Sequence, residues 1–210
     1  MAKHPISTNY GTDISTATNK GGSMLQIKSM LTGDIIQFPA FLTSFSQSWT
    51  SNWNEEEIYG RMDPIATFQG TKRSISLGFD LPSPELKVAK DNLKGCDLLA
   101  QFLYPGYIKQ TDVGFEQGDN VKQQGNIIAR PPLAAVKYTN LISAGGAFQL
   151  GYITGLEWAP DLEMGAFHQG DKIFPKVISL SFTFNVLHQG DRGFGADNKW
   201  VSSTKFFSGY

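Results

Sequence analysis

Alternating apolar and polar residues run through much of this 210-residue sequence, and they predict β-strands. The clearest pattern spans residues 73–81, where apolar side chains occupy every second position from Ile75 to Leu81. A strand places successive side chains on opposite faces, so this run predicts one buried and one polar face. Similar patterns occur at residues 24–31, 35–38, 41–49, 133–141, 149–159 and 176–187. The chain is therefore expected to be mainly β.

Turn residues indicate how some of these strands connect. Thr32-Gly33-Asp34 separates the first two patterns and predicts a hairpin. Pro39 cannot donate a ladder hydrogen bond, so the next strand should follow a bend or lie on a sheet edge. Gly151 and Gly155 favour bending within the strand predicted at 149–159. We expect a sheet that curves.

One segment, about residues 84–103, has the spacing of an amphipathic helix. Ser83 is the predicted N-cap, with Pro84 at the first helical position. Apolar residues then recur at intervals of three and four, at Leu86, Ala89, Leu93, Cys96, Leu99 and Leu103. Pro105 and Gly106 predict its end. The expected fold class is thus mainly β (α+β), with one helix packed on the sheet through Leu93, Cys96, Leu99 and Leu103.

The pattern divides the chain into three parts. Residues 1–23 lack periodicity and are rich in polar residues, which predicts a flexible N-terminal arm. Residues 24–190 form the expected β domain. Residues 191–210 form a C-terminal tail. The polar stretch 109–126 predicts a long external loop.

Composition narrows the classes of function. The net charge is −1 and no basic stripe is visible, so general affinity for nucleic acid is not expected. Cys96 is the only cysteine, which excludes an intrachain disulfide and fits a reducing cytoplasm. No apolar run approaches the roughly 18 to 20 residues of a membrane span. We expect a soluble protein without a secretion signal.

Catalytic chemistry is weakly represented. His4, His168 and His188 lack a nucleophile-elbow or His-Glu-x-x-His context, and His188 is interpreted as a satisfied edge histidine. The acids Asp161, Glu163 and Asp171 could bind a cation, although a turn of solvated acids is the favoured interpretation. Glycines at 190, 193 and 195 favour a flexible loop over a phosphate site. We expect no catalytic residues, metal or cofactor.

Residues 48–65 instead combine aromatic, acidic and basic side chains ahead of a turn. Trp49 and Trp53 should share one face of a strand, where they could stack on sugars or cover the core or a subunit interface; the latter is favoured. Arg61 and Asp63 could pair to lock the corner or reach a neighbouring subunit. The candidate interface residues are Trp49, Trp53, Tyr59, Arg61 and Asp63.

Several segments resemble the baseplate and tail-tube proteins of contractile-tailed bacteriophages, over about residues 24–190. They are Tyr59-Gly60-Arg61-Met62-Asp63-Pro64 ahead of Thr71-Lys72-Arg73, the run Arg130-Pro131-Pro132-Leu133, residues 151–161 (GYITGLEWAPD) and residues 174–180 (FPKVISL). The resemblance implies a curved antiparallel sheet with one helix, in which copies join long hairpins into a hexameric ring with a β-barrel inner wall.

The resemblance also implies a function and partners. Such a ring would initiate or continue the tail tube, contact neighbouring tail-tube, hub and baseplate proteins, and let DNA pass without reading it. The N-terminal arm and the 109–126 loop favour a specialised baseplate ring, a tube initiator, over the repeated tube subunit. The protein would assemble in the host bacterial cytoplasm and reside in the virion. A peptidoglycan-binding baseplate module and a cryptic hydrolase are the alternatives.

Overall fold

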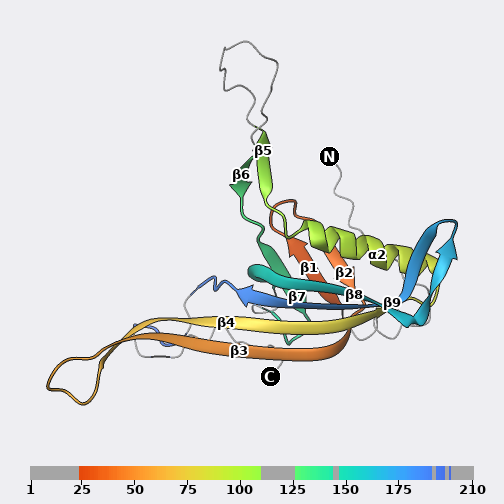
Figure 1. Cartoon of the computed structure of the whole chain (residues 1–210). Coiled ribbons are helices and arrows are strands. Elements are labelled where there is room, and N and C mark those ends of the chain that lie inside the picture. The colour runs from red at the N-terminus through yellow and green to blue at the C-terminus, as the bar shows by residue number, and fades with distance from the viewer. Residues whose placement is uncertain (1–23, 110–125, 144–146, 191–192, 197–198, 200–210) are drawn as a thin grey trace, which may run out of the picture.

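A computed structural model describes residues 24–109, 126–143, 147–190, 193–196 and 199 (Figure 1). The predicted N-terminal arm and most of the predicted tail lie outside these residues. The described part has a seven-stranded antiparallel sheet in the order β2-β1-β7-β8-β9-β4-β3, one helix and a separate β5–β6 ribbon. The elements are β1 (Leu25–Ser29), β2 (Ile35–Phe38), β3 (Phe41–Glu56), β4 (Ile65–Pro82), α2 (Leu86–Gln101), β5 (Gly106–Lys109), β6 (Asn126–Arg130), β7 (Ala134–Tyr138), β8 (Gln149–Gln169) and β9 (Lys172–Val186).

The mainly β prediction is confirmed, and so is the first hairpin. β1 and β2 pair antiparallel, and the amide of Ser29 donates to the carbonyl of Asp34 at 2.9 Å across the turn. Gly33 has a φ of 81°, a conformation that glycine adopts without a steric penalty. Lys109 pairs with Asn126, so the ends of the predicted 109–126 loop belong to a ribbon. Residues 110–125 lie outside the described structure.

Three strands continue well beyond their predicted ends. β3 runs to Glu56 and β4 begins at Ile65, which makes a hairpin of two long strands. β8 continues through Pro160 to Gln169. It pairs with β7 only over residues 149–151, so at Pro160 its one strand neighbour in the described sheet is β9, and a missing backbone donor is tolerated there. Register shifts occur at 154/157 and 161/166. Gly155, one of the two glycines expected to bend this strand, lies within the first shift, whereas Gly151 stays in register.

The predicted helix is present, but its expected N-cap is wrong. α2 begins at Leu86, and Glu85 occupies the cap position without a side-chain hydrogen bond. Ser83 remains part of the strand region, because its amide donates to the carbonyl of Lys176 at 2.6 Å. Its hydroxyl accepts a 2.9 Å hydrogen bond from the buried amide group of Asn92. Ser83 therefore anchors the helix to the sheet end instead of capping it.

The core lies between α2 and one face of the sheet (Figure 1). Leu99 is fully buried, and Phe38 and Phe79 approach with ring centroids 5.9 Å apart. A Cβ added at Gly95 would lie 2.8 Å from the Phe38 ring, so this glycine lets the helix approach β2 closely. Cys96 and Leu99 are buried, and Leu93 and Leu103 pack against them half-buried, as the helical spacing predicted.

The opposite face of the sheet is polar. Its strand positions carry small hydroxyl and amide side chains, and α2 does not cover them. Hydrogen bonds join these side chains across strands: Ser48 with Ser74 (2.7 Å), Ser76 with Thr183 (3.4 Å), Asn185 to Thr154 (3.1 Å) and Ser179 to Asp80 (2.7 Å). The alternation in the sequence thus separates a helix-covered apolar face from a hydrated polar one.

Replacing Leu99 by aspartate should lower the free energy of unfolding by about 3 kcal/mol or more, because an unpaired carboxylate would enter the core. Thermal melting and the yield of soluble protein measure the effect. Lys87→Asp places the same acid on an exposed position of the helix and serves as the control. Wild-type melting of Leu99→Asp would contradict this packing.

Candidate functional site

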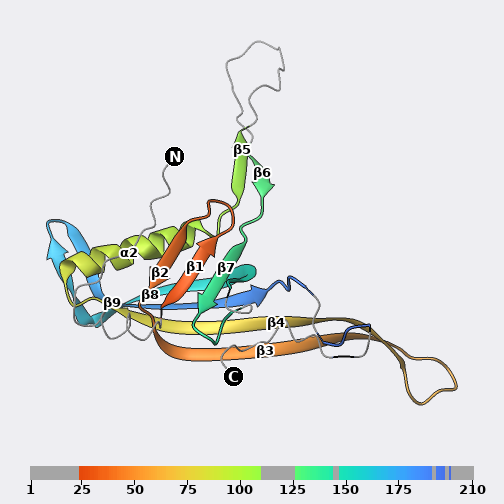
Figure 2. The same cartoon turned by 180° about the vertical axis from the view of Figure 1, so that it is seen from behind.

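The β3–β4 hairpin extends beyond the rest of the sheet. β9 pairs with β4 only over residues 74–82, whereas β3 pairs with β4 from Phe41 to Glu56. Residues 49–73 therefore form a two-stranded projection, called here the long ribbon, which leaves one end of the molecule in both views (Figures 1 and 2). All five predicted interface residues lie on it. Two-stranded ribbons are only marginally stable in water by themselves.

Three aromatic side chains share one face of the long ribbon. Trp53 is paired with Phe68, and their ring centroids are 5.1 Å apart at an interplanar angle of 57°. Trp49 lies on the same face, as its spacing from Trp53 predicted. Trp49, Trp53 and Phe68 are 43%, 55% and 53% exposed. Trp53 and Phe68 thus expose more than half of their surface, whereas Trp49 lies over the buried Arg73.

A β-bulge creates this aromatic pair. The register shifts between Asn52 and Trp53, so that Gln69 is skipped and Phe68 stands opposite Trp53. Gly70 beside the bulge has a φ of 145°, which favours glycine. A shift of one residue moves side chains to the other face of a strand. Sequence reasoning missed Phe68 for this reason, and Gly70 was the available signal.

A buried arginine anchors the base of the long ribbon. Arg73 is 1% exposed, and its Nε and Nη2 donate to Oε1 of Gln47 at 3.1 and 2.6 Å. Its guanidinium carbon lies 5.6 Å from the centre of the Trp49 ring. Nε2 of Gln47 donates in turn to the carbonyl of Leu141 at 3.1 Å. These contacts link the ribbon to the turn after β7, and neither Arg73 nor Gln47 was among the predicted site residues.

The ribbon tip, residues 57–64, is strongly exposed. Tyr59 and Met62 are 106% and 101% exposed. The amide of Arg61 donates to the carbonyl of Ile58 at 3.2 Å, and Gly60 adopts a φ of 90° within this turn. Arg61 and Asp63 are both exposed, and the described contacts include no ion pair between them. Residues 55–63 hold four acids and one arginine, which gives a net charge of −3.

Conventional chemical sites are not assembled elsewhere in the described residues. No group of three His, Cys, Asp or Glu side chains there is placed to hold a metal ion. Oδ1 of Asp161 accepts from the amides of Glu163 and Met164 at 3.0 and 3.4 Å, which makes a turn of acids. Burial raises the pKa of the Cys96 thiol to about 12, so it is protonated and poorly nucleophilic at neutral pH.

The remaining histidines and glycines also show no converging site among the described residues. His168 pairs with Ile173 near the β8–β9 turn, and His188 follows the end of β9 half-buried. His4 lies outside the described residues. The amide of Gly195 donates to the carbonyl of Lys199 at 2.8 Å. No helix in the described ranges has both the length and the apolar character to cross a membrane.

The sequence matches no established protein-family model, and a search of curated proteins found no similar sequence.

Replacing Gln47 by leucine should lower the free energy of unfolding by about 2 kcal/mol, because it removes the acceptor of a buried guanidinium. Chemical denaturation measures the loss. Ser48→Ala is the control, since its hydrogen bond to Ser74 is exposed and its removal should matter little. Equal stability of the two variants would show that the arginine anchor contributes nothing.

Proposed function

We propose that this protein is a noncatalytic structural subunit of a bacteriophage tail or baseplate that assembles into a ring. The long ribbon carries the proposal: it projects from the sheet and exposes Trp53, Phe68 and Met62 to solvent. Large contiguous exposed apolar patches on soluble proteins mark interaction surfaces. Trp, Tyr, Met and Arg are also the residue types enriched in such interfaces.

Strand edges give a second reason for assembly. β3 is the last strand of the sheet order, and no described strand pairs with its outer edge. Its length of 16 residues offers an extended row of backbone donors and acceptors. Closing copies side by side into a ring satisfies such an edge. A hexameric ring is the form implied by the resemblance of residues 59–73 to tail-tube and baseplate proteins.

The polar sheet face suits the inner wall of such a ring. Side chains such as Ser76, Thr183 and Asn185 are uncharged, and Asp80 and Glu157, which accept from serines of this face, are acids. Affinity for DNA depends mainly on lysine and arginine contacts to phosphates. A wall of hydroxyl, amide and carboxylate groups would therefore let DNA pass without holding it or reading its sequence.

Within the virion, the proposed role is a ring that initiates or continues the tail tube and joins it to the hub. Its partners would be neighbouring tail-tube, hub and baseplate proteins, and it would assemble in the bacterial cytoplasm. We favour the tube initiator over the repeated tube subunit. The reason is that residues 1–23 and 109–126 are additional to the segments that the resemblance implies for a minimal tube subunit.

A peptidoglycan-binding baseplate module is the second candidate, and the exposure of Trp49 and Trp53 is the observation that favours it. Sugar rings stack on flat aromatic faces. Trp53 and Phe68 meet at 57° and do not form one flat platform, which favours the assembly role. Pull-down with purified peptidoglycan distinguishes the two, because only the binding module is retained by the insoluble sugar polymer.

The purified protein should form oligomers as its concentration rises, because assembly removes the exposed aromatic face and the free strand edge from water. Light scattering and analytical ultracentrifugation measure the mass, and electron microscopy shows whether the particles are rings. A protein that stays monomeric at high concentration, also with neighbouring tail proteins, and is absent from virions would refute the proposal.

Arg61→Ala should fold normally but assemble poorly, since truncating an interface arginine leaves its partner group unpaired. The expected loss is about thirtyfold in affinity, corresponding to about 2 kcal/mol. Thermal melting and assembly yield are compared with those of Arg130→Ala, which removes an exposed arginine from β6. Unchanged assembly of Arg61→Ala would show that Arg61 does not belong to the assembly interface.

A further inference from the structure

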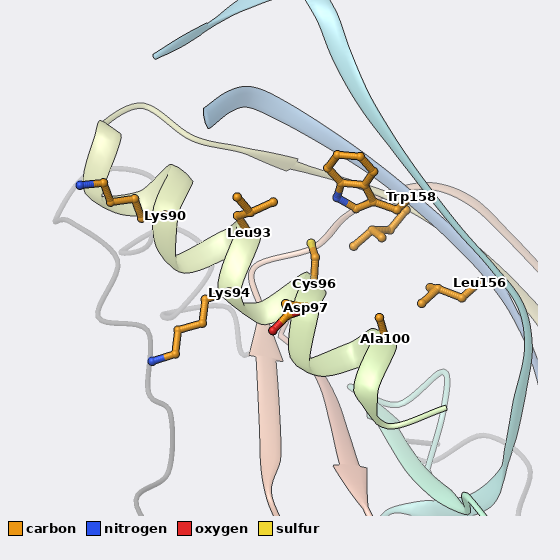
Figure 3. Close-up of a pocket in the computed structure, with 9 residues that line it drawn as sticks. Lys90, Leu93, Lys94, Cys96, Asp97, Ala100, Leu156 and Trp158 are labelled. Carbon is orange, nitrogen blue, oxygen red and sulfur yellow. The ribbon is translucent and has the colours of Figure 1, made fainter. Parts of the chain in front are cut away.

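A groove of about 600 Å³ lies between α2 and the strands β8 and β9. Its walls are apolar: Leu93, Cys96 and Ala100 on the helix face Leu156 and Trp158 on the opposite strand (Figure 3). Lys90 and Lys94 stand at the rim and point away from the strand (Figure 3). We call this feature the helix groove.

Trp158 gives the helix groove an aromatic wall. It lines the groove opposite Cys96 of the facing helix (Figure 3). Trp158 is nevertheless 45% exposed, so part of the indole is available for contact. On the rim, the ammonium group of Lys90 lies 5.4 Å from the centre of the Phe174 ring.

We propose that the helix groove receives the ribbon tip of a second copy of this chain. This inference rests on the proposed ring-forming function and names the surface that meets the long ribbon. The occupant is residues 57–64, with Tyr59 and Met62 entering the groove.

The geometry requires a second copy. The long ribbon leaves one end of the molecule, while α2 and the β8–β9 hairpin lie toward the other end (Figures 1 and 2). The helix groove is lined by α2, β8 and β9. The ribbon strands pair with each other as far as Glu56 and Ile65, so the tip is directed away from its own helix. A contact between two different patches is head-to-tail, and such contacts close into rings when the rotation between copies permits.

The side chains of the tip match the groove walls. Met62 is unbranched and flexible, and methionine sulfur makes favourable contacts with aromatic rings such as that of Trp158. Tyr59 has an apolar ring to bury beside Leu93 and Leu156 and a hydroxyl that can remain near water. Both tip side chains are fully exposed in the single chain, so they lose no existing contacts on docking.

Charge complementarity selects this occupant. The ribbon tip, residues 57–64, has two acids and one arginine, a net charge of −1, and the acids Glu55 and Glu56 precede it at the end of β3. The groove has two lysines, Lys90 and Lys94, against one acid, Asp97. The sequence of residues 199–210 is also aromatic but contains two lysines and no acid, so its charge has the same sign as the rim. Opposite potentials across an interface favour correct partners and disfavour wrong ones.

Site-directed disulfide formation tests the docking. Protein carrying Met62→Cys is mixed with protein carrying Lys94→Cys, and both are oxidised at about pH 8. The expected product is a disulfide between different copies. Cys96 can stay in place, because its pKa of about 12 keeps the thiol protonated. The matched control pairs Met62→Cys with Asp34→Cys, an exposed position at the β1–β2 turn.

Charge reversal provides a second measurement that leaves the core intact. Lys90→Glu with Lys94→Glu should weaken self-association by about thirtyfold or more, because charge reversal at the rim sets like charges against one another across the interface. Adding Glu56→Lys and Glu57→Lys to the same chain should restore it, because the two charges are exchanged. Circular dichroism verifies that each variant folds.

The outcomes separate the two proposals. Oligomers that form without the Met62–Lys94 disulfide, or that form it no faster than the Asp34 control, would overturn the groove inference and leave the ring standing. The groove inference would also be overturned if the Lys90→Glu, Lys94→Glu variant associated as strongly as the variant that adds Glu56→Lys and Glu57→Lys. Absence of oligomers at every concentration would overturn ring formation and the groove inference together.

Discussion

The pairing of β4 with β9 ends at Ser74 and Asn185, and the rest of the structure depends on where it ends. On one side of this point the strands have neighbours, and a helix covers their apolar face. On the other side β3 and β4 have only each other among the described strands. Arg73 stands at the boundary, where its hydrogen bonds to Gln47 replace the apolar packing that stops there. The buried guanidinium thus fixes the direction in which the long ribbon leaves the sheet.

The same boundary determines how far the sequence predicts the fold. Alternation identified the strands within the core, because only a strand with one buried face needs apolar residues at every second position. Residues 49–56 and 65–72 are almost all exposed. Neither face of these segments is buried, so the alternation of apolar and polar residues is lost there. β8 past Pro160 was missed because a proline is tolerated where β9 is its only described neighbour. The helix was predicted from its apolar spacing, whereas Ser83 proved to have a tertiary partner that no local pattern contains.

The candidate site was predictable in part for a related reason. Trp49, Trp53 and Tyr59 are large aromatic residues of types common in interfaces, so residue type alone was enough to make them candidates. The place of Phe68 opposite Trp53 depends on a bulge. The contact of Gln47 with Arg73 depends on the pairing of two strands, and both residues look like ordinary polar strand positions until the register is known. Gly151 is similar: a Cβ there would approach the Phe184 ring to 2.6 Å, a constraint set by the neighbouring strand.

An exposed ribbon with an aromatic face is also a hazard, because free strand edges pair indiscriminately with one another. Glu55 and Glu56 end β3 and Glu57 begins the ribbon tip, so like charges on two ribbons would repel each other there. The repulsion opposes tip-to-tip pairing but not the approach of a tip to a surface that carries lysines. One cluster of acids can therefore both prevent random aggregation and direct the ribbon toward a basic partner. The charges that would oppose tip-to-tip pairing and the charges proposed to guide assembly are thus the same residues.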